Sequence, residues 1–184
     1  MIKIYRASEL AREEILKRNN LPDLKKAEAA ASEIIADVRS RGDDALRFYN
    51  RKFDGCETAE LRVSEEEVEA AYREVGEYFL QTLAEAAANI REFHERQRRE
   101  GFSYTRPDGT RLGQRIMPLA RVGVYVPGGT AAYPSSVLMN VLPAKVAGVK
   151  EIIMVTPPGR DGSVSYPLAL VAADLAGVDK IYKV

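Results

Sequence analysis

The sequence has 184 residues, of which 46% are hydrophobic and 29% are charged, a composition typical of globular proteins and a length sufficient for one domain with a substantial core. Its 27 basic residues balance 27 acidic ones, so no overall positive field is available to hold nucleic acid. Met1 to Arg12 lacks the apolar stretch of a signal peptide and every apolar run is far shorter than the roughly 20 residues that span a bilayer, so we expect a cytoplasmic protein that binds neither nucleic acid nor membrane.

The first part of the chain predicts a series of helices. Ser8 is placed to cap a first helix, which ends before Pro22. From Leu24 to Gly42, apolar residues recur at three- and four-residue steps and form one stripe along a helix, which needs a covering surface. A further short helix is predicted over residues 43–53, because Asp54-Gly55 is a typical end signal.

A capping box marks the next helix most clearly. Ser64 and Glu67 have the spacing at which each side chain accepts a hydrogen bond from the backbone of the other residue. Helical periodicity then continues to Phe93, in two segments that meet near Gly76. We interpret the charged run Glu95 to Glu100 as a solvated helix end, with a binding patch as the alternative.

After Gly101 the pattern changes from helices to strands. Pro107-Asp108-Gly109 is a turn sequence between two strand-like runs, which predicts a β-hairpin over about 102–118. The elements predicted beyond it are a strand over 122–126, a helix over 135–147, a strand over 151–156, a helix over 166–176 and a strand over 180–184. This alternation predicts a parallel sheet with crossover helices on its faces.

The chain is therefore predicted to contain three regions. They are an N-terminal helical region (1–100), a β-hairpin connection (101–120) and an incomplete parallel α/β domain (121–184). The last region looks incomplete because parallel sheets normally have more than three strands and helices on both faces. Its final strand, 180–184, would leave an unpaired edge, which predicts self-association or poor solubility.

The strand over 122–126 leads directly into a glycine loop. In open α/β sheets, ligands bind outside the carboxyl ends of strands, where glycine lets the backbone approach and a helix N-terminus offers free N–H groups. Gly128, Gly129 and Thr130 occupy that place. The loop lacks the G-x-G-x-x-G spacing of a dinucleotide fingerprint, so a ligand role and a plain tight turn both stay open. Tyr125 can stack on a flat ring and form a hydrogen bond through its hydroxyl, or it can be a core residue.

Two neighbouring features also have two interpretations. Ser135 and Ser136 are expected to cap the following helix rather than to touch a ligand. The loop over residues 156–162 occupies the equivalent position after the next strand. We interpret it as a proline-rich surface connection, and the alternative is an edge of a cofactor cleft in which Arg160 supplies charge.

Cysteine and histidine, which often carry chemistry, occur once each, as Cys56 and His94. A single cysteine excludes an internal disulfide bond and a zinc cluster of thiolates. We expect Cys56 to be a spare buried or half-buried thiol. With a single histidine, this chain lacks the residues for a multi-histidine metal site and offers only one candidate base for a Ser-His-Asp triad.

Several separated segments carry a resemblance to a known family. They are Arg41–Leu46, Lys52–Asp54, Asn89–His94 with Gln97, Arg121–Thr130, Ser136–Met139 and Pro143–Gly148. Their residues, order and spacing resemble the histidinol dehydrogenase family, and the resemblance extends from about Ala29 to Val184. Ordered matches of this kind are far more specific than any single glycine motif.

The resemblance implies a zinc-containing, NAD-dependent homodimer with two related α/β domains, similar in fold to aldehyde dehydrogenases. The region 121–184 is then an incomplete Rossmann-like βαβαβ unit. The family oxidises L-histidinol through L-histidinal to L-histidine, the end of histidine biosynthesis. The resemblance implies that Tyr125 contacts NAD and that Gly128 and Gly129 shape the cofactor cleft.

The resemblance assigns no catalytic residue and no metal ligand to this chain. The family's zinc ligands, a glutamine, an aspartate and two histidines, and its adjacent Glu-His catalytic pair lie beyond the equivalent of Val184. We therefore expect the N-terminal portion of a family member, inactive by itself, in which His94 is a structural residue at a helix interface. The alternatives are a non-catalytic nucleotide-binding module or a dimerisation module whose helices at 24–40 and 77–94 pack against another chain.

Overall fold

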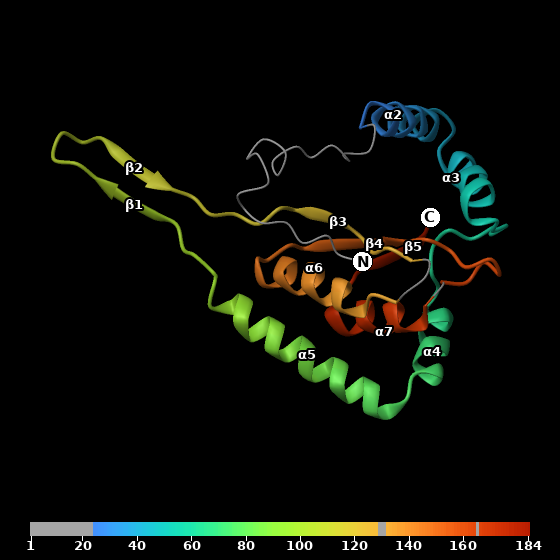
Figure 1. Cartoon of the computed structure of the whole chain (residues 1–184). Coiled ribbons are helices and arrows are strands. Elements are labelled where there is room, and N and C mark those ends of the chain that lie inside the picture. Colours follow the sequence, from blue (N-terminus) through green and yellow to red (C-terminus); the bar gives the residue numbers. More distant parts are fainter. Residues whose placement is uncertain (1–23, 129–131, 165) are drawn as a thin grey trace, which may run out of the picture. The chain divides into compact units, whose positions relative to one another are not determined.

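The structure is a computed structural model that describes residues 24–128, 132–164 and 166–184, and Figure 1 shows the order of its elements. The chain forms two compact units, Met1–Gly42 and Asp43–Val184. In the first unit the described element is helix α2 (Leu24–Arg41), none of whose residues is buried. Of the apolar stripe predicted there, Ile34 and Val38 are half-buried and Ile35 is 50% exposed.

Among the described residues, no helix combines the length and the apolar character that crossing a membrane requires.

The second unit begins with helix α3 (Asp43–Tyr49), which passes directly into the π-helical turn η2 (Asn50–Asp54). The sequence predicts one short helix here, and the structure shows that its last turn is wound more loosely. The predicted end is confirmed, since the N–H of Gly55 closes the turn on the carbonyl of Asn50.

Helices α4 (Glu65–Glu74) and α5 (Glu77–Glu95) follow. The capping box is confirmed in both directions: the Glu67 N–H donates to Ser64 Oγ over 3.3 Å, and the Ser64 N–H donates to Glu67 Oε2 over 3.0 Å. Extended backbone at Val75 and Gly76 separates the two helices, as predicted. A hairpin then connects α5 to the sheet.

The predicted hairpin is confirmed as strands β1 (Phe102–Thr105) and β2 (Arg111–Gln114), although its strands are shorter than predicted. They pair antiparallel, with Tyr104 opposite Leu112. Gly109 has a φ of 85°, a conformation that side-chain-bearing residues rarely adopt, so the predicted turn depends on this glycine. Every residue of both strands is exposed.

The predicted parallel sheet is also confirmed. Its elements in chain order are β3 (Arg121–Tyr125), α6 (Pro134–Val146), β4 (Glu151–Thr156), α7 (Pro167–Ala176) and β5 (Lys180–Lys183). The strands lie in the order β3-β4-β5. Because each crossover moves the chain one strand further in the same direction, two right-handed crossovers place α6 and α7 on the same face.

Helices α5 and α4 form a second layer outside α6 and α7, as Figure 1 shows. The core lies between the sheet and these helices. Its largest fully buried side chains include Leu138, Leu142, Ile152, Met154 and Val171. The opposite face of the sheet is not covered by α4–α7, and it carries Tyr125.

The expectation that the last strand exposes an unpaired edge is wrong. The residues just before α4 pair antiparallel with β5, with Arg62 opposite Tyr182. The Val63 N–H donates to the Ile181 carbonyl over 3.0 Å, and the Lys183 N–H donates to the Leu61 carbonyl over 2.7 Å. This short segment pairs with backbone groups at the outer edge of β5, so that edge gives no reason to expect self-association.

The expectation that Ser135 or Ser136 caps α6 is also wrong. The helix begins one residue before the serines, with Tyr133 at the N-cap position and no side-chain cap. Pro134 occupies the first helical position, where its missing N–H is no loss and its fixed φ suits the helix. The serines therefore lie within the first turn.

Asp179 joins three elements at the amino ends of the strands. Its carboxylate accepts hydrogen bonds from the Ile152 N–H at 2.7 Å and from Lys145 Nζ at 3.0 Å, which connects β5 to β4 and to the end of α6. The Ile152 N–H, assisted by the Lys145 ammonium, holds the pKa of the Asp179 carboxyl below its ordinary value. The ionised form is therefore favoured in the folded state.

We predict that Asp179→Asn lowers the free energy of unfolding by about 1 kcal/mol at neutral pH, since a charge-assisted hydrogen bond to a half-exposed group is lost. A depressed folded-state pKa stabilises the protein above the unfolded value, here 3.8, and this contribution disappears as the pH falls through the folded value. Urea unfolding at pH 7 and pH 3 should show the difference shrinking in acid. A difference that stays constant, or that also appears in Glu60→Gln, would contradict this.

Candidate functional site

Tyr125 lies at the carboxyl end of β3 on the face that α4–α7 leave uncovered. Its neighbours Val124 and Val126 point into the core, while Tyr125 is 64% exposed. In the sheet register Tyr125 lies opposite Val155, which in turn lies opposite Tyr182. An exposed phenol ring thus stands at the edge where ligands of parallel sheets usually bind.

Gly128 brings the loop after β3 against the loop after β4. Pairing of the two strands continues one residue past β3, since the Val126 N–H donates to the Val155 carbonyl over 2.9 Å. A Cβ built on Gly128 would lie 3.4 Å from Pro157 Cδ, so even a methyl group would be in full contact there. Gly129 and Thr130, the remaining predicted residues, lie outside the described residues.

The loop after β4 is closed on itself. Pro158 is buried and forms an isolated bridge with Val164. The Asp161 carboxylate accepts hydrogen bonds from the Ser163 hydroxyl at 2.7 Å and the Ser163 N–H at 3.1 Å. Arg160 is exposed beside it. This local closure agrees with the surface connection that the sequence predicts.

Sequence reasoning missed a buried lysine at the same end of the sheet. Lys183 is 4% exposed, and its Nζ donates to Glu67 Oε1 over 2.7 Å. Asn50 Nδ2 donates to the Lys183 carbonyl over 3.0 Å. One signal was present: Lys183 follows Ile181 by two residues, which places both on the same face of β5, the covered one.

Cys56 is buried, as predicted. Burial raises the pKa of its thiol, and the negative charge of Asp54 raises it further. The reactive thiolate is therefore disfavoured, and Cys56 is a packing residue.

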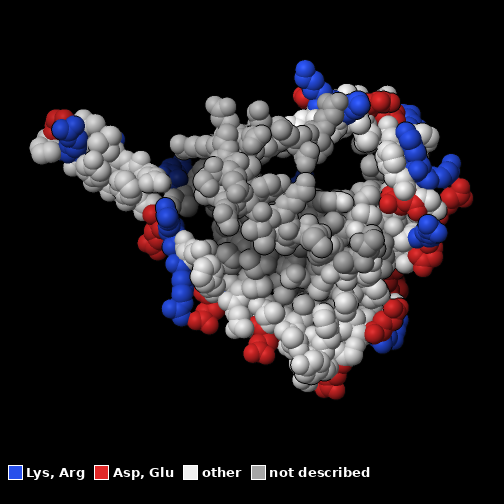
Figure 2. All heavy atoms as spheres, in the orientation of Figure 1, with Lys and Arg blue, Asp and Glu red and all other residues white. Residues whose placement is uncertain are grey.

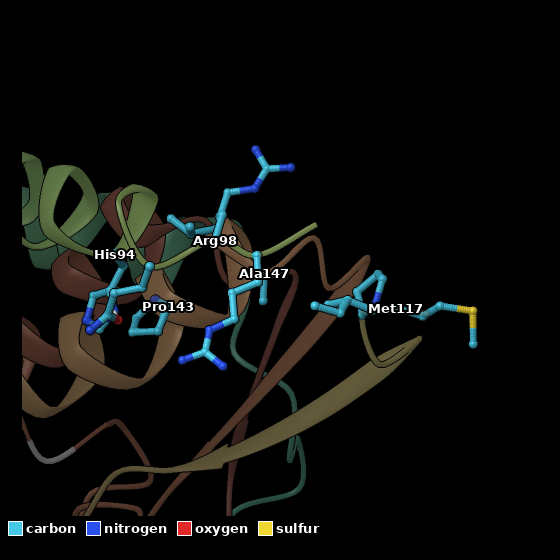
Figure 3. A pocket seen from close by; sticks show the side chains of 10 residues that line it. His94, Arg98, Met117, Pro143 and Ala147 are labelled. Carbon is cyan, nitrogen blue, oxygen red and sulfur yellow. Dashed lines mark hydrogen bonds between the residues drawn. The ribbon is translucent and has the colours of Figure 1, made fainter. Parts of the chain in front are cut away.

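A pocket of about 440 Å³ lies at the opposite, amino edge of the sheet. It is bounded by the end of α5, the segment before β3 and the end of α6, with His94, Gln97, Met117, Pro118, Pro143 and Ala147 among its lining residues. Figure 3 shows His94 and Pro143 together at one end and Met117 at the other. His94 Nδ1 lies 2.7 Å from Gln97 Oε1. His94 therefore faces residues of α6 across this pocket, at the end of the sheet opposite to Tyr125.

Comparison with known proteins identifies the family. The histidinol dehydrogenase family model matches residues 17–184. The chain belongs to the histidinol dehydrogenase family. It is 52% identical over 183 residues to a histidinol dehydrogenase of Bacillus cereus, covering 100% of this chain and 40% of that relative. It is 54% identical over 155 residues to the one of Halalkalibacterium halodurans, covering 84% of this chain and 36% of that relative.

A solved structure agrees with the family assignment. The crystal structure of histidinol dehydrogenase from Elizabethkingia anophelis matches with a TM-score of 0.80 and 34% sequence identity, over 85% of this chain and 36% of that chain. This confirms the predicted α/β fold. The chain spans 36% to 40% of the length of these relatives.

We predict that Glu67→Ala lowers the free energy of unfolding by about 3 kcal/mol, because it leaves the Lys183 ammonium buried without its partner and removes half of the capping box. Lys183→Met should change the free energy of unfolding by less than about 1 kcal/mol, because the substitution removes the buried ammonium itself and an apolar side chain fills the same space. Denaturant unfolding compares the two variants. Equal losses in both would show that the ion pair itself, and not the unpaired lysine, sets the energy.

Proposed function

We propose that this chain holds one side of NAD in a histidinol dehydrogenase. The relatives carry that name, and the family resemblance implies oxidation of L-histidinol through L-histidinal to L-histidine by a homodimer, which we place in the cytoplasm because Met1 to Arg12 lacks the apolar stretch of a signal peptide. The observation that supports the NAD role most directly is the exposed ring of Tyr125 at the carboxyl edge, next to the close-packed Gly128 loop. A flat ring beside accessible backbone is a surface that fits a nucleotide.

NAD, when bound, supplies the hydride acceptor for the oxidation. In this proposal Tyr125 stacks on a flat ring of the cofactor and offers its hydroxyl as a hydrogen-bond donor. Gly128 keeps a side chain out of the loop, so the backbone shapes the cleft, and the same role is proposed for Gly129 from the resemblance alone. These residues bind and orient, and the one histidine of the chain, His94, lies at the opposite edge.

The zinc that the resemblance implies does not fit the described residues. Among them there is no group of three or more His, Cys, Asp or Glu side chains that could hold a metal ion. We therefore assign no zinc ligand among the described residues.

Calorimetric titration with NAD tests the proposal, since the chain has no tryptophan to report binding by fluorescence. We expect saturable binding that weakens roughly tenfold or more in Tyr125→Ala, because stacking on an aromatic ring contributes about 1–3 kcal/mol. Tyr125→Phe should retain most of the affinity if stacking dominates.

Tyr104→Ala is the matched control, because Tyr104 is also an exposed tyrosine but lies on the hairpin. It should bind NAD as the unchanged chain does. Equal weakening in both variants, or no binding at millimolar NAD, would contradict the assignment of Tyr125.

A further inference from the structure

One row of four side chains crosses the sheet near the carboxyl ends of its strands. In the sheet register, Tyr125 of β3 lies opposite Val155 of β4, and Val155 lies opposite Tyr182 of β5. The antiparallel bridge beyond β5 then places Arg62 opposite Tyr182. Residues that lie opposite each other in neighbouring strands point to the same face of a sheet. The row therefore presents a tyrosine, a valine, a tyrosine and an arginine on one face.

The pattern of burial shows that this face is the one that α4–α7 leave uncovered. Arg62 is exposed, whereas Leu61 and Val63 on either side of it are 6% and 8% exposed. Tyr182 is half-buried and lies between two buried residues of β5. Because side chains alternate between the two faces along a strand, Arg62 and Tyr182 share the face of Tyr125. Figure 1 shows α6 and α7 on the other side of the strands.

The charges on this face are paired at one end of the strands and not at the other. Near the amino ends, Glu151 accepts hydrogen bonds from Arg121 and, over 2.8 Å, from Lys180. Both cations there have an acidic partner. At the carboxyl ends, Arg62 forms no ion pair within the part of the chain that the structure describes. Its guanidinium group therefore keeps its charge available for an anionic ligand.

A local cation matters here because the molecule offers no broad positive field. The formal net charge is zero, and Figure 2 shows basic and acidic side chains interspersed on the described surface that faces the viewer. A phosphate group at the carboxyl edge is therefore attracted by individual side chains rather than by the protein as a whole. Arg62 is the side chain in this row that can do so.

The row also runs in the direction that a dinucleotide takes. Dinucleotides bind across the carboxyl ends of parallel strands, not along them. Neighbouring strands lie about 4.8 Å apart, so Tyr125 and Tyr182 are separated by about 10 Å and Tyr125 and Arg62 by about 14 Å. A flat ring, a ribose and a phosphate group joined in sequence fit within that span, and the long side chain of Arg62 can bend back along the row.

We propose that Arg62 binds the pyrophosphate group of NAD and that Tyr182 continues the aromatic surface that begins at Tyr125. One ring of the cofactor stacks on Tyr125, the chain of the cofactor crosses Val155 and Tyr182, and the guanidinium group of Arg62 donates to a phosphate oxygen. This inference rests on the NAD role proposed above. It adds the two residues that determine the direction of the cofactor across the sheet.

Substitution of Arg62 tests the phosphate contact. We expect Arg62→Ala to weaken NAD binding about tenfold, because a charge-assisted hydrogen bond to a phosphate is lost. Arg62→Lys should retain part of the affinity, since the charge stays but the planar fork is lost. Adenosine and nicotinamide riboside, which have no phosphate, should bind Arg62→Ala as they bind the unchanged chain. Calorimetry measures NAD, and NMR titration measures the weaker fragments.

Tyr182→Leu should weaken NAD binding severalfold, because this variant removes the ring while an apolar side chain still covers the sheet. Arg121→Ala is the matched control, since Arg121 is an arginine on the same face at the amino end, and it should bind NAD as the unchanged chain does. Circular dichroism verifies that every variant folds.

The outcomes separate this inference from the NAD role itself. Weaker binding in Tyr125→Ala with unchanged binding in Arg62→Ala would overturn the inference and leave the NAD role intact. Equal weakening in Arg62→Ala and Arg121→Ala, or equal weakening for NAD and for the phosphate-free fragments, would overturn the phosphate contact. Unchanged binding in Tyr182→Leu would overturn the aromatic surface. An unchanged chain that does not bind NAD would overturn both the inference and the NAD role.

Discussion

The order of the three parallel strands is the constraint on which the rest of the second unit depends. Because β3, β4 and β5 are added in one direction, both right-handed crossovers bring their helices to the same face. That face, with Ile152 and Met154 at its centre, becomes the core. The other face keeps Tyr125 exposed, and the exposed tyrosine is what makes a nucleotide surface at this edge possible.

Polar contacts fix the two ends of this sheet. At the amino ends, Asp179 joins the starts of β4 and β5 to α6. At the carboxyl ends, Lys183 joins β5 to the cap of α4 through Glu67. The segment ending at Val63 completes the edge of β5. Side chains drawn from distant parts of the sequence therefore hold the strand ends in register, and the loop that contains Gly128 starts from a defined position.

Much of this fold could be predicted because its signals are local. The capping box at Ser64, the turn at Gly109 and the alternation of strands and helices after Arg121 each depend on neighbouring residues, and all three are confirmed. The pairing of Leu61–Val63 with β5 was missed because three residues are too few to show periodicity and their partner lies more than a hundred positions away.

The candidate site was predictable only in outline. The position of Tyr125 at a strand end follows from the sequence pattern, but its exposure depends on which face the helices cover. The wrong prediction for Ser135 has a local cause, because the proline one residue earlier takes the first helical position. Lys183 was missed because its burial results from packing against α4, far away in the sequence.

The most direct test of the central claim is to map NAD onto the 15N-labelled chain by NMR. The account predicts that the largest amide shifts occur at Val126 and Gly128 and at Thr156 of the neighbouring strand end, while His94 and Gln97 at the amino-edge pocket stay unchanged. Shifts concentrated at His94 and Gln97 would place the nucleotide at the wrong edge of the sheet and contradict the account.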